Sequence, residues 1–439
     1  MFASITLSNK SIMPILDWSS KTERLLPDGN LITESVINPG SRDQSSDTIE
    51  NRLIQGDNLR VMSALLEDYE GKIDLIYVDP PFFTNKGYAA RVGRGEDSRK
   101  PEEWQLAEGY HDEWEDLDSY LDMLHPRLRL MHRLLAPTGS LYLHLDWHAN
   151  SYARILLDEI FGYENFRNEI VWTYHGPSPI RSAFNRKHDT ILFYTKTNQY
   201  VFNVDEVRVP YASNTVETFK SSKKAGFGKE PNLERGKVPE DWWYFPVVAR
   251  LHNERTGYPT QKPERLLERI ILASTNPGDL VVDFFGGAGT TGAVAARLNR
   301  RFILSDLQSR AITTARSRLI LNWQGSGDDD PGSWGKTFPI QMQREEHLKT
   351  NPYLKLADFD EQEIELKDNL ISLPADLVSR VEYWEVDPDW QGDIYHSQVQ
   401  GVRPWRKGDL PASLILPENR GKVCVRIVLV SGEQIQEVL

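Results

Sequence analysis

The chain has very little cysteine: among its 439 residues, only Cys424 carries a thiol. One thiol excludes an internal disulfide and a zinc site built from cysteines, which fits a reducing compartment. Long apolar runs are also lacking, since none approaches the roughly 18 residues that cross a membrane. The first residues show no apolar signal-peptide core. We therefore expect a cytoplasmic protein with no membrane partner, and no His-Glu-x-x-His spacing gives reason to expect a metal.

Positive charge is scarce overall but unevenly distributed. There are 51 Lys and Arg against 64 Asp and Glu, a net charge of -13, which taken alone argues against nucleic acid. However, acidic residues are concentrated after about residue 325, and basic residues are in excess from Arg167 to Arg318. The basic candidates for DNA contact are Lys220, Lys223, Lys224, Lys229, Arg235 and Lys237. On charge alone, a solvated surface is an equally good interpretation of them.

Short apolar strands alternate with amphipathic helices, which is typical of an open α/β sheet. Strands are expected at 51–56, 73–78, 140–146, 169–174, 189–194, 279–283 and 301–306. Helices are expected at 58–69, 118–135, 149–161, 263–275, 290–299 and 308–322. We expect the strands at 169–174 and 189–194 to pair antiparallel at one edge of the sheet.

Interruptions of this alternation divide the chain into six parts. They are an irregular N-terminal arm (1–50), a first α/β half (51–199), an insertion (200–256), a second α/β half (257–323), a linker (324–349) and an acidic, β-rich C-terminal module (350–439). Within the first half, the polar stretch from Thr84 to about Asp116 is long for a connection. We predict that it is a lid over a site.

The strand at 73–78 ends in Asp79-Pro80-Pro81-Phe82. Open α/β sheets bind ligands at the carboxyl ends of their strands, where this carboxylate lies. The prolines fix the backbone and lack N–H groups, so their carbonyls can accept hydrogen bonds. An acceptor carboxylate, a carbonyl and the ring of Phe82 together suit a planar group that bears an NH2. The exocyclic amines of nucleobases fit this description.

A second cluster surrounds a glycine turn between a predicted strand and a predicted helix. Gly287 and Gly289 let a ligand approach the backbone, and the helix N-terminus offers free N–H groups. Asp306 ends the next strand, where a carboxylate typically holds ribose hydroxyls. Because the turn has no Lys for phosphates, S-adenosylmethionine fits better than a nucleotide. Its cationic sulfonium suits a pocket with the carboxylates of Asp57, Asp283 and Asp306, although each one alone could be a strand-end cap.

Three motifs together resemble those of the amino-group DNA methyltransferases. Asp79-Pro-Pro-Phe82 resembles their catalytic Asp-Pro-Pro-Tyr/Phe motif, and residues 283–291 resemble their methionine-binding Asp-Pro-Phe-x-Gly-Ser-Gly-Thr-Thr loop. Residues 258–263 are similar to the Pro-Thr-Gln-Lys-Pro signature that precedes this loop. The order of the motifs is that of the β class, which includes the Mod subunits of type III restriction systems. In this chain Phe284 replaces the usual Pro and Ala288 the usual Ser.

The resemblance covers about residues 50 to 322. It implies a Rossmann-like methyltransferase sheet of seven strands whose chain order is circularly rotated. It also implies S-adenosylmethionine as the cofactor, with Asp57 at its adenine and Asp306 at its ribose. The residues expected at its methionine end and in the adjoining pocket are Thr260, Gln261, Lys262, Asp283, Phe285, Gly287, Gly289 and Thr290.

The implied reaction is methyl transfer to the N6 amino group of an adenine in double-stranded DNA, since Asp rather than Ser precedes the prolines. Methylation of cytosine N4 is one alternative, and a non-catalytic DNA-binding subunit with this fold is another. A paired base cannot reach such a site, so the target must flip out. We expect the base to stack on Phe82, with Trp172 or Tyr174 as a second wall. Burial in the core of the sheet is the alternative for those two residues.

The remaining parts suggest further contacts. We expect the insertion at 200–256 to recognise the DNA sequence. The acidic C-terminal module is better suited to bind a protein than DNA. A restriction endonuclease or another defence-system protein bound through this module, and a homodimer, are the further partners considered.

Overall fold

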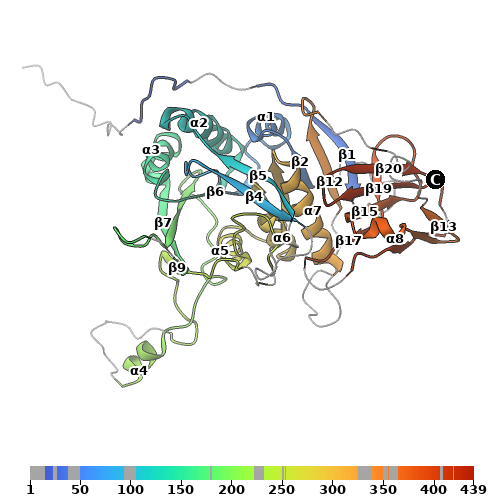
Figure 1. Cartoon of the computed structure of the whole chain (residues 1–439). Coiled ribbons are helices and arrows are strands. Elements are labelled where there is room, and N and C mark those ends of the chain that lie inside the picture. The colour runs from blue at the N-terminus through green and yellow to red at the C-terminus, as the bar shows by residue number, and fades with distance from the viewer. Residues whose placement is uncertain are drawn as a thin grey trace, which may run out of the picture.

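A large mixed sheet organises the molecule (Figure 1). This computed structural model describes residues 15–22, 27–37, 50–92, 105–177, 180–221, 232–249, 252, 254–324, 339–349, 354, 364–405, 409–418 and 420–439. In spatial order, the strands are β16 (Tyr395–Ser397), β1 (Leu31–Ile37), β12 (Ile340–Glu345), β2 (Asn51–Gln55), β11 (Arg301–Asp306), β10 (Leu280–Asp283), β3 (Ile73–Val78), β6 (Leu135–Leu145), β8 (His188–Thr195), β7 (Phe166–Thr173) and β9 (Trp242–Tyr244).

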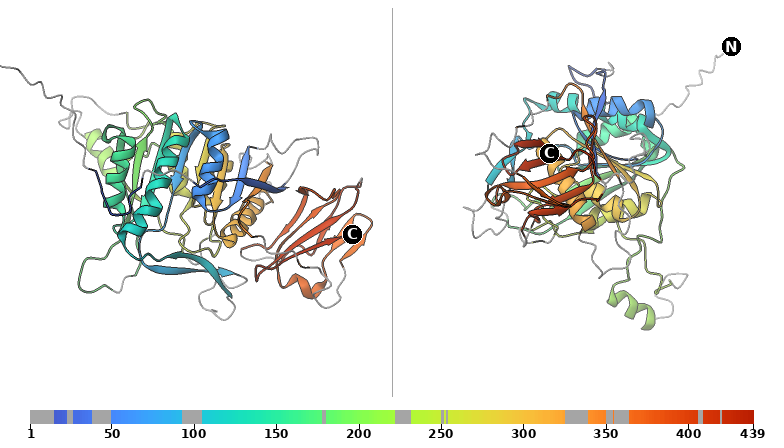
Figure 2. Two further views of the ribbon diagram at one scale, coloured as in Figure 1. Left: turned by 90° about the horizontal axis from the view of Figure 1, so that it is seen from above. Right: turned by 90° about the vertical axis from the view of Figure 1, so that its right-hand side faces the viewer.

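Helices cover both faces of this sheet (Figures 1 and 2). One face carries α1 (Asn58–Tyr69), α2 (Leu117–Leu134) and α3 (Asn150–Phe161), and the other carries α5 (Glu264–Ser274), α6 (Thr290–Arg297) and α7 (Ser309–Gln324). Successive residues of a strand point to opposite faces. Leu75 and Tyr77 of β3 accordingly pack with α5 and α6, whereas Ile76 and Val78 pack with α1 and α2. The apolar runs that were predicted to be strands are therefore buried on both faces of the sheet.

The predicted methyltransferase sheet is present, but it forms only part of a larger one. Seven neighbouring strands, β2-β11-β10-β3-β6-β8-β7, contain the expected strands, and β8 pairs antiparallel with both β6 and β7. The antiparallel pairing of β7 with β8 is thus confirmed, although β9 lies outside β7 and forms the edge. The expectation of seven strands was too small, because β12, β1 and β16 extend the sheet beyond β2.

Two segments expected to be irregular contribute strands. Residues 31–37 of the predicted arm form β1, and residues 340–345 of the predicted linker form β12. These two strands pair antiparallel with each other, and β12 pairs in parallel with β2. The prediction of irregular structure is therefore wrong at residues 31–37 of the N-terminal arm and at residues 340–345 of the linker.

The stretch predicted to be a lid forms a β-hairpin. Strands β4 (Lys86–Val92) and β5 (Gln105–Asp112) pair antiparallel and lie outside the main sheet. The Arg91 backbone N–H donates to the Gly257 carbonyl at 3.0 Å, which fastens the hairpin to the chain segment before α5. The hairpin crosses in front of the central sheet (Figure 1).

The insertion and the C-terminal module differ in how they join the body. In the insertion, α4 (Ser213–Ser221) stands away from the main sheet (Figure 1). The C-terminal module is rich in strands as predicted, with β17 (Val399–Val402), β15 (Val381–Asp387), β19 (Cys424–Leu429) and β20 (Gln434–Val438) in one sheet. A second small sheet contains β13 (Glu365–Lys367), β14 (Leu370–Ser372) and β18 (Ser413–Ile415), and the short helix α8 (Ala375–Val378) lies nearby. Tyr383, Val402 and Val428 pack in the same apolar cluster as α7, so the module is part of the body.

Candidate active site

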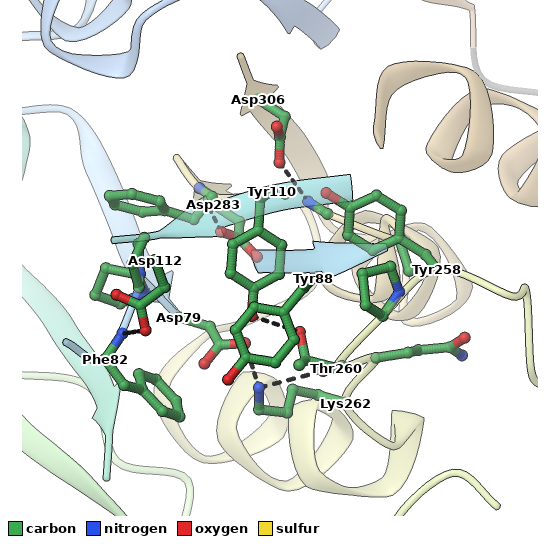
Figure 3. A pocket seen from close by; sticks show the side chains of 18 of the residues that line it. Asp79, Phe82, Tyr88, Tyr110, Asp112, Tyr258, Thr260, Lys262, Asp283 and Asp306 are labelled. Carbon is green, nitrogen blue, oxygen red and sulfur yellow. Dashed lines mark hydrogen bonds and ion pairs between the residues drawn. The ribbon is translucent and has the colours of Figure 1, made fainter. Parts of the chain in front are cut away.

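One cavity of about 660 Å³ contains both predicted clusters (Figure 3). This volume is in the range of small-molecule sites, roughly 300–1,000 Å³. The cavity lies at the carboxyl ends of the central strands, where β2, β3, β10 and β11 each end beside an aspartate. Its lining includes Asp57, Asp79, Pro80, Pro81, Phe82, Trp172, Tyr174, Thr260, Gln261, Lys262, Asp283, Phe285, Gly287, Thr290 and Asp306.

Asp79 presents one engaged and one unengaged carboxylate oxygen. Lys262 forms an ion pair with Oδ2 and also donates to the Thr260 carbonyl at 3.3 Å. Oδ1 is buried and has no hydrogen-bond partner among the described residues. A buried acceptor without a partner is costly, so this atom is suited to receive a donor from a ligand. The sequence suggests that Lys262 contacts the methionine carboxylate, which stays a prediction; in the structure its ammonium holds the carboxylate of Asp79.

The turn after Asp79 is held by Asp112, which sequence reasoning missed. This buried carboxylate accepts backbone N–H groups from Phe82, Phe83 and Thr84 at 3.1, 2.9 and 2.8 Å. It also accepts the Thr84 hydroxyl and the Trp114 indole N–H. About thirty positions separate Asp112 from the turn, so no local motif could have indicated the contact.

The ring of Phe82 has a histidine and a lysine as neighbours. The His144 ring stacks on it with centroids 5.8 Å apart, and the Lys262 ammonium lies 5.4 Å from its centroid. His144 is fully buried and is hydrogen-bonded to Tyr77 at 2.8 Å and to Asp189 at 3.3 Å. These buried polar groups fix the orientation of His144 and therefore support Phe82 from behind. His144 was not predicted either.

Trp172 and Tyr174 were expected either to form a second wall for the base or to be buried in the core of the sheet, and the structure has features of both. Both line the cavity, and their rings lie 5.1 Å apart. Trp172 is only 2% exposed and donates its indole N–H to the Phe245 carbonyl at 2.9 Å. The Tyr174 hydroxyl donates to Asp189 at 3.0 Å. Their place in the wall is therefore compatible with contact to a base, and the contact itself stays a prediction.

Asp283 and Asp306 organise the glycine turn. Asp283 accepts the Phe285 N–H at 2.9 Å and the Thr291 hydroxyl at 2.6 Å, and Asp306 accepts the Gly287 N–H at 2.9 Å. Burial raises the pKa of Asp283 to about 7, and the nearby negative charges of Asp79 and Asp306 add to the rise. Burial likewise raises the pKa of Asp306 to about 6. A cationic ligand would favour the ionised form of both.

The glycines are required by the geometry of the turn. Gly287 has a φ of +47° and Gly289 a φ of +72°, a region that side chains other than glycine rarely adopt. A Cβ atom on Gly289 would lie 2.7 Å from the Cβ of Ala315, and one on Gly287 would lie 3.3 Å from the ring of Tyr258. Arg318 of α7 braces the same turn by donating to the Thr290 hydroxyl at 2.8 Å.

Residues 254–262 form a connected turn. The Gln261 amide oxygen accepts from the Thr256 backbone N–H at 2.9 Å, and its NH2 group donates to the Glu254 carbonyl. Thr260 has a φ of +55° and its hydroxyl lies 3.2 Å from that of Tyr110 on the hairpin. Gln261 therefore shapes the cavity wall, and contacts of Thr260 and Gln261 with a cofactor stay predictions.

Asp57 combines a structural task with its place in the cavity. Its carboxylate caps α1 by accepting the Leu59 N–H at 2.8 Å, and Arg127 of α2 donates to it at 3.1 Å. The alternative of a strand-end cap is thus correct for its local contacts. Its side chain is still 41% exposed and faces the cavity, so contact with the cofactor's adenine stays a prediction.

The basic candidates of the insertion are only partly described. Lys223, Lys224 and Lys229 lie outside the described residues, as does the side chain of Lys220. Arg235 forms an ion pair with Asp205 at 2.7 Å, and Lys237 forms one with Glu240. For these last two residues, the internal pairs offset much of the charge that DNA would meet.

Two further observations concern metals and membranes. Within the described ranges, no group of three or more His, Cys, Asp or Glu side chains is arranged to hold a metal ion. Among the helices in that part of the chain, none combines the length and the apolar character needed to span a bilayer.

An α/β sheet with an acidic adenosine pocket beside an Asp-Pro-Pro-Phe turn defines the class of S-adenosylmethionine-dependent amino-group methyltransferases. Residues 73–317 match the family described as DNA methylase, and the chain belongs to this family. It is therefore an S-adenosylmethionine-dependent DNA methyltransferase. The buried Asp283 and the half-buried Asp306, whose carboxylates line the cavity, fit this cationic cofactor.

Two curated proteins of similar sequence support the assignment. The chain is 33% identical over 272 residues to the type II methyltransferase M.BglII of Bacillus subtilis, covering 60% of this chain and 68% of that protein. It is 31% identical over 273 residues to the DNA adenine methyltransferase YhdJ of Escherichia coli (strain K12), covering 61% and 82%. Among solved structures, PvuII DNA methyltransferase (cytosine-N4-specific) matches with a TM-score of 0.43 and 18% identity, covering 64% of this chain and 88% of that chain.

Proposed function

We propose that the protein methylates the N6 amino group of an adenine that is flipped out of double-stranded DNA. The observation that carries this proposal is the buried Oδ1 of Asp79, which has no hydrogen-bond partner among the described residues; Asp79 and Phe82 line the same cavity. An Asp before the two prolines favours adenine over cytosine by family resemblance. The similarity to YhdJ, named as a DNA adenine methyltransferase, supports the same choice.

The chain's own groups prepare the amino group of the base. Its nitrogen is a poor nucleophile because the lone pair is delocalised into the ring. We expect Oδ1 of Asp79 to accept one N–H and the Pro80 carbonyl to accept the other, since the Pro81 carbonyl already accepts the Tyr120 hydroxyl at 2.9 Å. Both acceptors together draw the nitrogen towards tetrahedral geometry and localise the lone pair.

Lys262 and Phe82 complete this arrangement. Lys262 holds Oδ2, so the carboxylate cannot rotate freely and Oδ1 is left for the base. Phe82 offers a stacking surface whose contact with a base contributes about 1–3 kcal/mol. Bound S-adenosylmethionine supplies the methyl group. The excess proton of the methylated nitrogen passes to Asp79, and alignment of the two reactants can contribute roughly 7–11 kcal/mol to the lowering of the barrier.

An Asp79→Ala variant tests the role given to this carboxylate. It should bind S-adenosylmethionine and DNA normally, measured by calorimetry and by gel shift, while losing methyl transfer. Phe82→Ala should lose much of the activity, and Phe82→Tyr should keep most of it because a stacking ring remains. Full activity in the Asp79→Ala variant would refute the mechanism.

Sequencing the DNA of an expression strain for modified bases identifies the base and the atom. N6-methyladenine at one sequence is the expected result, whereas N4-methylcytosine would overturn the choice of base. A protein that binds no S-adenosylmethionine in calorimetric titration would instead be a non-catalytic DNA-binding subunit.

The same proposal includes the roles that the sequence suggested for the insertion and the C-terminal module. The insertion at 200–256 recognises the DNA sequence, which is supported by α4 standing away from the body where a duplex can reach it (Figure 1). A restriction endonuclease or another defence-system protein binds through the C-terminal module. A second copy of the chain is the other partner considered. DNA as the substrate agrees with the cytoplasmic location expected from the sequence.

A further inference from the structure

Phe184 has the most exposed large apolar side chain among the described residues, at 98%. It lies in the connection between β7 and β8, which here comprises residues 174–187. Single exposed apolar residues are common on protein surfaces, so exposure alone indicates nothing. The position of Phe184 in the chain and the positive charge of the same connection suggest a function.

Both ends of the connection are walls of the active-site cavity. Tyr174 begins it and Asp189 follows it, and both line the cavity. The ends are fastened together, because the Tyr174 N–H donates to the Lys187 carbonyl at 3.1 Å and the Tyr174 hydroxyl donates to Asp189 at 3.0 Å. Asp189 in turn contacts His144, the ring that stacks on Phe82. The connection that carries Phe184 therefore leaves from and returns to the wall of the proposed base pocket.

The connection is also basic. Residues 174–188 contain Arg181, Arg186 and Lys187 and no acidic residue, although the whole chain has a net charge of -13. The Arg186 guanidinium lies 4.1 Å from the centroid of the Trp147 ring, which is itself 50% exposed. The exposed Phe184 ring and the cationic side chains of the same connection are complementary to a base stack and its two phosphate backbones.

We propose that Phe184 enters the DNA duplex at the place that the flipped base leaves and stacks between the neighbouring base pairs. Arg181 and Arg186 bind the flanking phosphates. Apolar side chains that wedge between base steps are a known means of stabilising distorted DNA. Flipping costs a few kcal/mol of lost pairing and stacking, and a ring in the gap offsets part of this cost. This inference rests on the proposed transfer to a flipped base.

A Phe184→Ala variant tested on two duplexes separates this role from others. One duplex carries the normal target pair, and the other carries the target base opposite an abasic site, where it is already unpaired. On the paired duplex, kcat/KM should fall roughly 5- to 150-fold, which corresponds to the loss of one stacking contact. On the second duplex the loss should be under about threefold, because less flipping cost remains to be offset. Phe184→Trp, which retains a stacking ring, should restore most of the activity.

Tyr163→Ala is the matched control. Tyr163 is 63% exposed and precedes β7 at the end opposite to the connection, so its loss should change neither duplex. With 2-aminopurine as the target base, Phe184→Ala should also show less fluorescence from the flipped state on the paired duplex. Unchanged activity on the paired duplex, or an equal loss on both duplexes, would overturn the wedge. Failure of the wild-type protein to methylate either duplex would instead refute the proposed function.

The two arginines have a separate readout. Arg181→Gln and Arg186→Gln should each reduce the slope of log K against log salt for DNA binding by about 1, as expected for the loss of one phosphate contact. Slopes equal to that of the wild type would remove these residues from the DNA contact.

Discussion

Asp112 is a carboxylate that no catalytic motif contains, yet it shapes the catalytic turn. Phe83 has a φ of +66° and Asn85 a φ of +54°. Backbone of this kind costs about 1–3 kcal/mol per residue and persists only when its surroundings enforce it. The three backbone N–H groups bound by Asp112 provide this enforcement, because they belong to the consecutive residues Phe82, Phe83 and Thr84, which include the strained Phe83.

An Asp112→Asn variant should therefore act on catalysis more than on cofactor binding. The amide has one acceptor oxygen and a donor NH2, so it cannot accept all of these donors, and hydrogen bonds to charged groups contribute about 1.5–3 kcal/mol each. We expect kcat to fall about tenfold or more while the Kd for S-adenosylmethionine changes less than threefold. Glu113→Gln is the control, since Glu113 is an exposed neighbour. A normal kcat in Asp112→Asn would show that the turn keeps its geometry without the carboxylate.

The raised pKa of Asp283 predicts how stability depends on pH. Its pKa is about 7 in the folded protein and its ordinary value is 3.8, so between these values the folded state retains a proton that the unfolded state has lost. Stability from this group is complete below pH 4 and is lost as the pH rises through 7. The whole change is on the order of 4 kcal/mol.

Asp283→Asn removes this titration, because an amide resembles the protonated acid in shape and charge. The melting temperatures of the ligand-free variant and wild type should be similar just below pH 4, and the variant should melt increasingly higher as the pH rises towards 8. Differential scanning calorimetry across this range measures the difference. Parallel curves for the two proteins would contradict the assigned pKa.

At this scale, sequence reasoning located residues whose neighbours along the chain reveal their task. Asp79 precedes two prolines, and Gly287 lies in a strand-to-helix turn; both line one cavity. Asp112 and His144 were missed because they act on Phe82 from positions 30 and 62 residues away, and neither lies in a motif. Lys262 was recognised within its motif, but the sequence could not show that its ammonium reaches Asp79, 183 positions earlier.

Among the elements, the β4–β5 hairpin lies at the cavity, where the sequence suggested a lid. The sequence did not indicate that this stretch forms two paired strands. A long polar stretch after Phe82 indicated a cover for the site, and the hairpin does contribute Tyr88 and Tyr110 to the cavity. These rings stack with centroids 4.8 Å apart (Figure 3). Gly- and Ala-containing strands have weak β propensity, so their pairing depends on contacts such as this one, which the sequence does not display.

Gly109 offers a test of the hairpin as a cover. A Cβ atom there would overlap the Tyr88 carbonyl oxygen and lie 3.1 Å from Pro259, so Gly109→Ala should displace the hairpin from the cavity. Overpacking of this kind costs about 1–3 kcal/mol, and we expect S-adenosylmethionine to bind roughly 5- to 100-fold more weakly in calorimetric titration. Gly87→Ala is the control on the same hairpin, because its Cβ would meet atoms no closer than 3.4 Å. Equal affinities in both variants would mean that the hairpin does not contribute to cofactor binding.

At the scale of the whole molecule, the sequence indicated separate parts where the structure has a continuous body. The strand β1 was hidden because its partners β12 and β16 lie about 300 and 360 residues later, and an isolated strand has no periodic signal of its own. The six helices on the two faces were foreseen, since each carries its apolar positions at helical spacing. Long-range pairing is what joins the N-terminal arm, the methyltransferase sheet and the C-terminal module.

A buried ion pair also links the module to the methyltransferase body. Arg316 of α7 forms an ion pair with Glu385 of β15, and both side chains are at most 5% exposed. The Arg316 guanidinium also lies 4.5 Å from the centroid of the Tyr383 ring. Burial alone would lower the pKa of Arg316, but the Glu385 carboxylate holds it above its usual range. Arg316 therefore stays charged in its buried position.

Arg316→Met should leave Glu385 buried without its partner, a change that typically costs about 3–5 kcal/mol. Adding Glu385→Leu should restore much of the loss, because the remaining charge is removed. Arg301→Met is the control, since its ion pair with Glu50 is exposed and contributes about 1 kcal/mol or less. Because α7 shares one apolar cluster with the module, we expect one cooperative thermal transition in every variant. Two separate transitions in the wild-type protein, or a melting temperature of Arg316→Met equal to that of Arg301→Met, would show that the module is an independent attachment rather than a part of the catalytic body.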